Sequence, residues 1–276
     1  MIPRIIHQIA PRDPNKWPAI WKPCRESWQE RFPDFEHRLW DDDDDLTNFI
    51  ETHYPDYAPA FKRMPTLIMQ LDFIRYVILY HYGGIYADMD MYCYQNFYNA
   101  LDPQKVYIVE LDGSDYPVEN SLMIAPKNHP FFYRCLSQAH ERFIKLERTH
   151  PSALNRLRDF QSPNPQESHP TLPYSVMNTV SVKFLYEMYQ QSEGGVELLP
   201  CSLFNRKDHS YDPSYRTKHV STRLWSKDGQ YIPHDPEYYD FFKDYTSNIR
   251  LAQNVQKQKQ DTKTRSSRNK TRFRFK

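Results

Sequence analysis

Four polar side chains lie close together in the sequence and could hold a metal ion beside a phosphorylated ligand: Asp72, Arg75, Asp88 and Asp90. Asp72 and Arg75 are three residues apart, so on a helix they share a face and can pair. Asp88 and Asp90 are two residues apart and project to the same side of an extended chain. Carboxylate oxygens suit Mg²⁺ or Mn²⁺ better than Zn²⁺, and these ions usually complete their coordination with phosphate and water. The group therefore predicts a divalent metal that holds a diphosphate, with a sugar hydroxyl beside it.

A helix, two glycines and a short strand must position these side chains. Apolar residues recur at helical spacing before the glycines, at Leu67, Ile68, Leu71, Ile74, Ile78 and Leu79. They predict a helix over 65–82 whose charged residues must be paired, because burying an unsatisfied charge is costly. Gly83 and Gly84 can adopt positive φ and end this helix, and residues 85–87 then form a short strand.

A second run of acidic residues, 41–45, contains further Asp-x-Asp matches. We interpret this run as a solvated turn in which Asp44 or Asp45 caps a helix over 46–53. The pair at 88 and 90 differs because it follows an apolar helix, two glycines and a strand, which is the context expected of a ligand site.

Two longer motifs in the first hundred residues resemble a known family. They are Leu71-Asp72-x-x-Arg75-x-x-x-Leu79-x-x-x-Gly83-Gly84-Ile85-Tyr86-x-Asp88-x-Asp90 and the opening Ile2-Pro3-Arg4-Ile5-Ile6-His7-Gln8-Ile9. Both are similar to motifs of the DXD-containing sugar transferases. That family includes the Golgi initiating mannosyltransferases, the inositol-phosphoceramide mannosyltransferases, capsular polysaccharide enzymes and the glucosyltransferase domains of clostridial toxins. The resemblance implies a GT-A fold, a nucleotide-sugar donor, Mn²⁺ or Mg²⁺, and retention of anomeric configuration.

The resemblance also implies a role for each matching residue. Asp72 and Arg75 would bind the donor sugar and its phosphate side, and Tyr86 would pack beside the nucleotide. Asp88 would contact sugar and ribose hydroxyls and reach the metal, partly through water, whereas Asp90 would be a direct metal ligand.

Further donor and metal contacts are implied outside the central motif. Ile9 in the first strand and Asn120 before a later strand match donor-site positions. The segment 218–225 is similar to a late family element in which His219 would bind the metal and Trp225 the diphosphate, flanked by Lys218, Arg223 and Lys227 as candidate phosphate contacts. Ala10 stands where many members have tryptophan, so base stacking would come from Trp17, Trp21 or a tyrosine.

Composition and element order favour one large α/β domain. The chain has 276 residues but only six glycines, and it contains neither G-x-G-x-x-G nor a Walker motif. Alternating strands and helices predict a Rossmann-like, mostly parallel central sheet flanked by helices, with ligands at the carboxyl ends of the strands. Expected strands are 4–9, 36–40, 85–87, 106–110, 121–125 and 195–200; expected helices are 17–32, broken at Pro23, 46–53, 57–63, 65–82, 129–146 and 174–190. Residues 159–173 are expected to form a long loop, and His7 a hydrogen-bonded core histidine.

Residues 1–250 are expected to form the catalytic domain and 251–276 a basic, disordered tail. From Arg250 to Lys276 the net charge is +9, whereas the rest of the chain carries −8. Such a segment has too little apolar surface to join a core. It could be a solubilising terminus, or it could contact an anionic membrane surface or nucleic acid, and of these two ligands we favour the membrane. The four cysteines show no metal or disulfide spacing, and the chain starts without a signal peptide or apolar anchor. We therefore expect a cytoplasmic protein with peripheral membrane contact.

Together these features predict a metal-dependent retaining glycosyltransferase in polysaccharide biosynthesis. It would move a sugar from a nucleotide-sugar donor, with UDP favoured and GDP-mannose as the second choice, to a glycan or lipid-linked hydroxyl. One alternative is a sugar-nucleotide or glycan-binding protein that has lost catalysis. A metal-dependent phosphohydrolase is another, although the sequence lacks a further Asp/His cluster for two metals.

Overall fold

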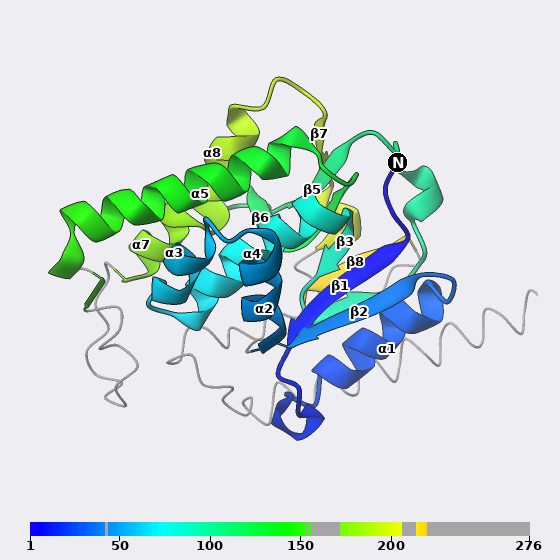
Figure 1. Ribbon diagram of the computed structural model, residues 1–276. Coiled ribbons are helices and arrows are strands. Elements are labelled where there is room, and N and C mark those ends of the chain that lie inside the picture. The colour runs from blue at the N-terminus through cyan, green and yellow to red at the C-terminus, as the bar shows by residue number, and fades with distance from the viewer. Residues whose placement is uncertain (42–43, 153, 156–171, 206–213, 220–276) are drawn as a thin grey trace, which may run out of the picture. The chain divides into compact units, whose positions relative to one another are not determined.

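Short apolar strands alternate with helices from the first residues of the chain, and a central sheet collects most of the strands (Figure 1). The computed structural model describes residues 1–41, 44–152, 154–155, 172–205 and 214–219. The strands are β1 (Ile5–Ala10), β2 (Glu36–Asp41), β3 (Gly84–Ala87), β4 (Met91–Cys93), β5 (Val106–Glu110), β6 (Val118–Ala125), β7 (Val196–Leu199) and β8 (Thr217–His219). Among the described residues, six of them form one sheet in the order β2-β1-β3-β6-β5-β7.

Most neighbouring strands in this sheet run parallel. β1 pairs in parallel with both β2 and β3, and β5 pairs in parallel with β7. β6 is the reversed strand, antiparallel to β3 on one side and to β5 on the other. The predicted mostly parallel sheet is therefore confirmed, and β3 ends immediately before Asp88.

Helices cover both faces of the sheet. They are η1 (Pro14–Lys16), α1 (Trp21–Arg31), α2 (Asp44–His53), α3 (Ala58–Arg63), α4 (Leu67–Tyr82), η2 (Tyr98–Ala100), α5 (Pro130–Thr149), α7 (Leu172–Thr179), α8 (Val182–Gln190) and α9 (Cys201–Phe204). Alternate residues of β3 divide between two apolar layers: Tyr86 packs with α4, α5 and α8, whereas Ile85 and Ala87 pack with α1 and β4. The site motif is thus held between two separate cores.

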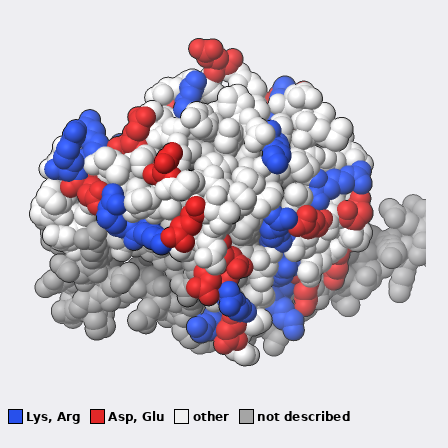
Figure 2. Space-filling view, viewed as in Figure 1, with Lys and Arg blue, Asp and Glu red and all other residues white. Residues whose placement is uncertain are grey.

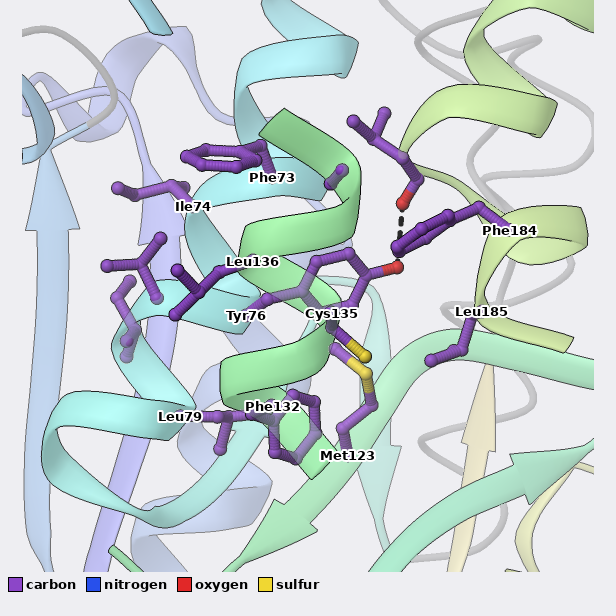
Figure 3. Close-up of a cluster of buried hydrophobic side chains, with 14 of the residues drawn as sticks. Phe73, Ile74, Tyr76, Leu79, Met123, Phe132, Cys135, Leu136, Phe184 and Leu185 are labelled. Atoms are coloured by element: carbon purple, nitrogen blue, oxygen red, sulfur yellow. Dashed lines mark hydrogen bonds between the residues drawn. The ribbon is translucent and has the colours of Figure 1, made fainter. Parts of the chain in front are cut away.

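The larger core surrounds Tyr76, which is fully buried in the middle of α4 (Figure 3). Phe132 of α5 and Phe184 of α8 lie against its ring, with centroid distances of 6.1 and 5.9 Å. Its hydroxyl donates to the carbonyl of Val180 at 2.6 Å, so the polar atom is satisfied without reaching water. This packing fixes the rotation of α4 about its axis, and with it the direction in which the charged residues of α4 point.

Two expected helices differ from those observed. The helix expected over 17–32 starts only at Trp21 and is not broken at Pro23, because Pro23 lies in its first turn, where a missing N–H costs no hydrogen bond. The helix expected over 174–190 is two helices, α7 and α8, separated at Val180 and Ser181. Pro173 belongs to the first turn of α7 rather than to a loop, while 156–171 lie outside the described residues.

A small two-stranded sheet lies beside the main one. β4 pairs antiparallel with β8, so that Met91 faces His219 and Cys93 faces Thr217. The pairing extends by a hydrogen bond of 2.8 Å from the Tyr94 amide to the Arg216 carbonyl. Neither three-residue strand was expected from the sequence, yet together they bring residue 219 next to residue 90.

The described residues belong to one compact unit, Met1–Ile232, so the predicted boundary at 250 and the basic tail lie outside them. On the face seen in Figure 2, Lys and Arg side chains are mixed with Asp and Glu. Neither sign of charge dominates that described face, unlike the one-signed stripe expected of a nucleic-acid-binding surface. In the described part of the chain, every helix is too short or too polar to cross a membrane.

Candidate metal and donor site

The turn between α4 and β3 sets the position of the whole site. Gly83 and Gly84 adopt φ values of +66° and +93°, which favour glycine. A Cβ atom at Gly84 would lie 2.5 Å from the carbonyl oxygen of Ile5, so β1 approaches the turn too closely for any side chain. His7 also fixes the turn, because its Nε2 donates to the Gly83 carbonyl at 3.0 Å while its Nδ1 accepts from the Trp40 indole at 3.2 Å. His7 is fully buried, as expected of a hydrogen-bonded core histidine.

Asp72 and Arg75 form a buried ion pair on the sheet-facing side of α4. Arg75 Nη2 lies 3.0 Å from Asp72 Oδ1, and both side chains are almost completely buried. Arg75 Nε donates to the Leu71 carbonyl at 3.1 Å and Nη1 to the Asn120 carbonyl at 2.9 Å, while the Asn120 amide donates to Asp72 Oδ1 at 2.9 Å. Burial raises the pKa of Asp72, and Arg75 opposes that rise. The structure therefore brings together three of the predicted donor-site residues.

Asp88 joins this group from the end of β3. Its backbone N–H donates to the Ser121 carbonyl at 2.8 Å, which ties the turn to β6. Its Oδ1 accepts from the Tyr86 hydroxyl at 2.7 Å and lies 3.5 Å from Arg75 Nη1, whose guanidinium stacks 4.8 Å above the Tyr86 ring. Burial raises the pKa of Asp88 to about 6, although Arg75 favours the charged form. The side chain remains 26% exposed, so it can contact a ligand.

Asp90 and His219 complete a cluster with Asp88. His219 Nε2 lies 3.2 Å from Asp90 Oδ1, and one ligand atom from each of Asp88, Asp90 and His219 lies within 4.8 Å of the others. Two carboxylates and an imidazole at this spacing fit a divalent ion, which would also take ligands from phosphate or water. The residues predicted as metal ligands are thus the ones that the structure brings together.

Glu119, in β6, was missed by the sequence analysis. Its Oε1 lies 2.6 Å from Nδ1 of His219, on the side of the ring opposite Asp90, and its Oε2 accepts a hydrogen bond from the Asn205 amide. Burial alone would lower the pKa of His219, but Glu119 and Asp90 together raise it well above its usual value. A glutamate within an apolar strand looks like a solvent-facing residue, so nothing local in the sequence marks it.

An irregularity in β6 explains how one strand reaches the whole site. Val109 of β5 pairs with Glu119, but the preceding Ile108 pairs with Met123, so residues 120–122 have no direct partner in β5. These residues and Glu119 supply the Asn120 carbonyl and amide, the Ser121 carbonyl and the Glu119 carboxylate to the site. Bulges beside functional sites commonly redirect side chains in this way.

The remaining predicted contacts lie elsewhere or outside the described residues. Ile9 is buried in the larger core, and Ala10 is buried at the end of β1. Trp225, Arg223 and Lys227 fall within 220–276, which the structure does not describe.

In the acidic run at 41–45, of which residues 42 and 43 lie outside the described residues, Arg12 pairs with Asp41 at 2.6 Å and with Asp44 at 3.6 Å. Asp44 and Asp45 occupy the first turn of α2, where carboxylates favour the helix dipole.

Comparison with known proteins finds relatives of the segment that contains this motif. Residues 18–108 match the family model described as glycosyltransferase sugar-binding region containing DXD motif. The chain is 38% identical over 133 residues to inositol phosphoceramide mannosyltransferase 2 of Schizosaccharomyces pombe, covering 48% of this chain and 36% of the relative. It is 35% identical over 137 residues to a mannosyl phosphorylinositol ceramide synthase of Saccharomyces cerevisiae, covering 49% and 34%. The chain therefore matches about a third of the length of these relatives, and the predicted resemblance is confirmed.

A solved structure supports the fold independently. The UDP-bound glycosyltransferase domain of the YGT toxin is similar over 72% of this chain and 79% of that domain, with a TM-score of 0.52 and 11% identity. At this identity the likeness concerns the fold alone, and it confirms the expected GT-A architecture.

Proposed function

We propose that this chain is a metal-dependent glycosyltransferase that moves a sugar from a nucleotide-sugar donor to a hydroxyl acceptor. The observation that carries the proposal is the cluster of Asp88, Asp90 and His219, with ligand atoms within 4.8 Å, beside the buried pair of Asp72 and Arg75. The match of 18–108 to a DXD-containing sugar-binding region supports the same chemistry.

Asp88, Asp90 and His219 would hold Mn²⁺ or Mg²⁺. A bound divalent cation would supply positive charge against the diphosphate that leaves during transfer. The three side chains are 26%, 10% and 13% exposed, so each is oriented by the protein and still reaches the surface of the site.

Asp72, Arg75, Asn120 and Tyr86 would shape the donor-sugar side of the site. Each guanidinium nitrogen of Arg75 contacts the protein, at Leu71, Asn120 and the two site carboxylates. Arg75 therefore holds Asp72 and Asp88 in fixed directions, and the Asn120 amide donates to the same Asp72 oxygen that Arg75 contacts. A preorganised site of this kind loses little free energy to rearrangement when the donor binds.

Mannose is the first sugar to test, because the curated relatives are mannosyltransferases by name. The donor would then be GDP-mannose, which reverses the preference for UDP drawn from the sequence, and UDP-sugars become the second choice. The acceptor would be a glycan or lipid-linked hydroxyl. We further propose that anomeric configuration is retained, which the anomeric signals of donor and product in NMR spectra would test.

Release of nucleoside diphosphate from a panel of GDP- and UDP-sugars, with and without Mn²⁺, tests the proposal. We expect Mn²⁺-dependent release from one donor, and a loss of about 100-fold or more in Asp90→Asn, because even residues behind metal ligands are worth 10–100-fold. Asp34→Asn is the matched control, since Asp34 is an exposed carboxylate paired only with Arg4 in the contacts observed here. Donor binding without any release or transfer would favour a binding protein that has lost catalysis.

A further inference from the structure

His219 lies between two carboxylates that contact opposite nitrogens of its ring. Nε2 faces Asp90 at 3.2 Å, on the side of the proposed metal, and Nδ1 faces Glu119 at 2.6 Å, on the side away from it. An imidazole binds a metal through one nitrogen, and the hydrogen bond at the other decides which nitrogen is available. Glu119 accepts a hydrogen bond from Nδ1–H, and that contact leaves Nε2 for the cation.

Glu119 is itself fixed on its far side. The amide of Asn205 donates to Oε2 of Glu119, and Asn205 follows directly on the short helix α9. α9 is also tied to the strand that carries His219, because the Arg216 amide donates to the Leu203 carbonyl at 2.8 Å and the Thr217 hydroxyl to the Phe204 carbonyl at 2.7 Å. The segment after β7 therefore holds both the histidine and the carboxylate behind it.

We propose that Glu119, held by Asn205, is a positioning residue for His219: it fixes the imidazole with its proton on Nδ1 and directs Nε2 to the divalent cation. This inference rests on the metal site of the proposed function. Two hydrogen-bond donors converge on the two oxygens of Glu119, and a carboxylate accepts from both without any change in its neighbours. A glutamine offers one acceptor and one donor, so it would oppose one of these donors unless the Asn205 side chain turned to present its own oxygen, and its neutral oxygen is a weaker acceptor for Nδ1–H.

Binding of Mn²⁺ to the full-length protein, measured by calorimetry without donor, tests this role apart from transfer. We expect the dissociation constant to rise about 10–100-fold in Glu119→Gln. Glu119→Asp keeps the charge but shortens the side chain, and should also weaken binding. Glu197→Gln is the control, because Glu197 is an exposed carboxylate of the same sheet, pairs with Lys105 and is not one of the residues that contact His219. Circular dichroism of the metal-free variants verifies that each is folded.

A double substitution tests the geometry. In the Glu119→Gln, Asn205→Asp variant the amide can again accept from His219 and donate to the new carboxylate, so Mn²⁺ affinity should recover to within several-fold of the wild type. Long-range ¹H–¹⁵N spectra at one fixed Mg²⁺ concentration should show His219 bound through Nε2, with its proton on Nδ1, in the wild type and the double variant, and a smaller bound population in Glu119→Gln. The His219 signal is identified by its loss in His219→Gln.

Three results would overturn the inference. Wild-type affinity in both Glu119 variants would show that the carboxylate does not position the ligand. Mn²⁺ affinity in the double variant that stays as low as in Glu119→Gln would show that the hydrogen bonds of residue 119 do not position the ligand. If the wild-type protein binds no Mn²⁺, both the metal site and the proposed function are refuted. If the Glu119 variants bind Mn²⁺ as tightly as the wild type, only the role of Glu119 is refuted and the proposed function stands.

Discussion

Acid should destabilise this protein through His7, one of its most completely buried polar side chains. The neutral ring satisfies both nitrogens, because Nε2–H donates to the Gly83 carbonyl and Nδ1 accepts from the Trp40 N–H. Protonation would place a second N–H against the indole N–H, so the charged form has lost a hydrogen bond as well as its hydration. Burial accordingly lowers the pKa of His7 from 6.5 to about 3, against the opposing effect of the Gly83 carbonyl.

The sign and size of the effect follow from proton linkage. Between pH 6.5 and pH 3 the unfolded chain binds a proton at His7 and the folded chain does not, so the free energy of unfolding falls as the pH falls through this window. With these pKa values, the loss attributable to His7 between pH 7 and pH 4.5 is about 2–3 kcal/mol. That is a large fraction of the 5–15 kcal/mol typical of a folded domain.

Urea unfolding between pH 7 and pH 4.5 measures this loss, and comparison of the wild type with His7→Gln separates the contribution of His7 from that of other titrating groups. His7→Gln can still donate to Gly83 but does not titrate, so its stability at pH 7 should be lower than that of the wild type and its further loss on acidification smaller by about 2–3 kcal/mol. His150→Gln, at an exposed histidine, controls for the removal of an imidazole. Equal pH dependence in His7→Gln and the wild type would refute the assignment of a buried neutral His7.

Three further perturbations test other parts of the structure. Arg75→Lys keeps a positive charge but cannot make the contacts of the planar guanidinium, so unfolding by urea should show a loss of about 1–3 kcal/mol and calorimetry a weaker affinity for the donor. Gly84→Ala should lower the free energy of unfolding by about 1–3 kcal/mol, because the φ of +93° disfavours other residues and the new methyl group would meet the Ile5 carbonyl. Gly194→Ala is the control: its φ is +105° but the space around it is open, so thermal unfolding should show a smaller loss of stability. Removing residues 256–276 should leave donor hydrolysis unchanged and weaken binding to anionic vesicles at low salt, since each Lys or Arg near such a surface contributes about 1 kcal/mol. If the shortened protein binds vesicles as well as the full chain does, the tail does not contact the membrane.

Local patterns predicted the segment around the Asp-x-Asp pair well. The helix expected over 65–82 is present as α4, and Gly83 ends it. The following strand, β3, places Asp88 directly after its carboxyl end. Each of these features depends on neighbours within a few residues, so the sequence itself contains the signal. The family resemblance and the GT-A fold were predicted from the same segment and are confirmed.

Long-range features could not be derived in the same way. β4 and β8 have three residues each and lie more than a hundred residues apart, so no periodic pattern indicates that they pair. His219 was expected near Asp90 only through the family resemblance, and Glu119 was missed because its partner is a hundred residues away. The break between α7 and α8 was also missed; it falls at Val180, whose carbonyl accepts a hydrogen bond from Tyr76, a residue 104 positions earlier in the chain.

The pairing of β4 with β8 has a consequence for the order in which the protein is made. During synthesis from the amino terminus, α4, the glycine turn and both aspartates leave the ribosome early, whereas His219 emerges about 130 residues after Asp90. Domains can begin to fold while the rest of the chain is still being made. A nascent chain that ends before Thr217 would therefore contain Asp72, Arg75 and both aspartates but not the third proposed ligand. In the proposed metal site, the full set of ligands would come together only when a late strand docks on an early one.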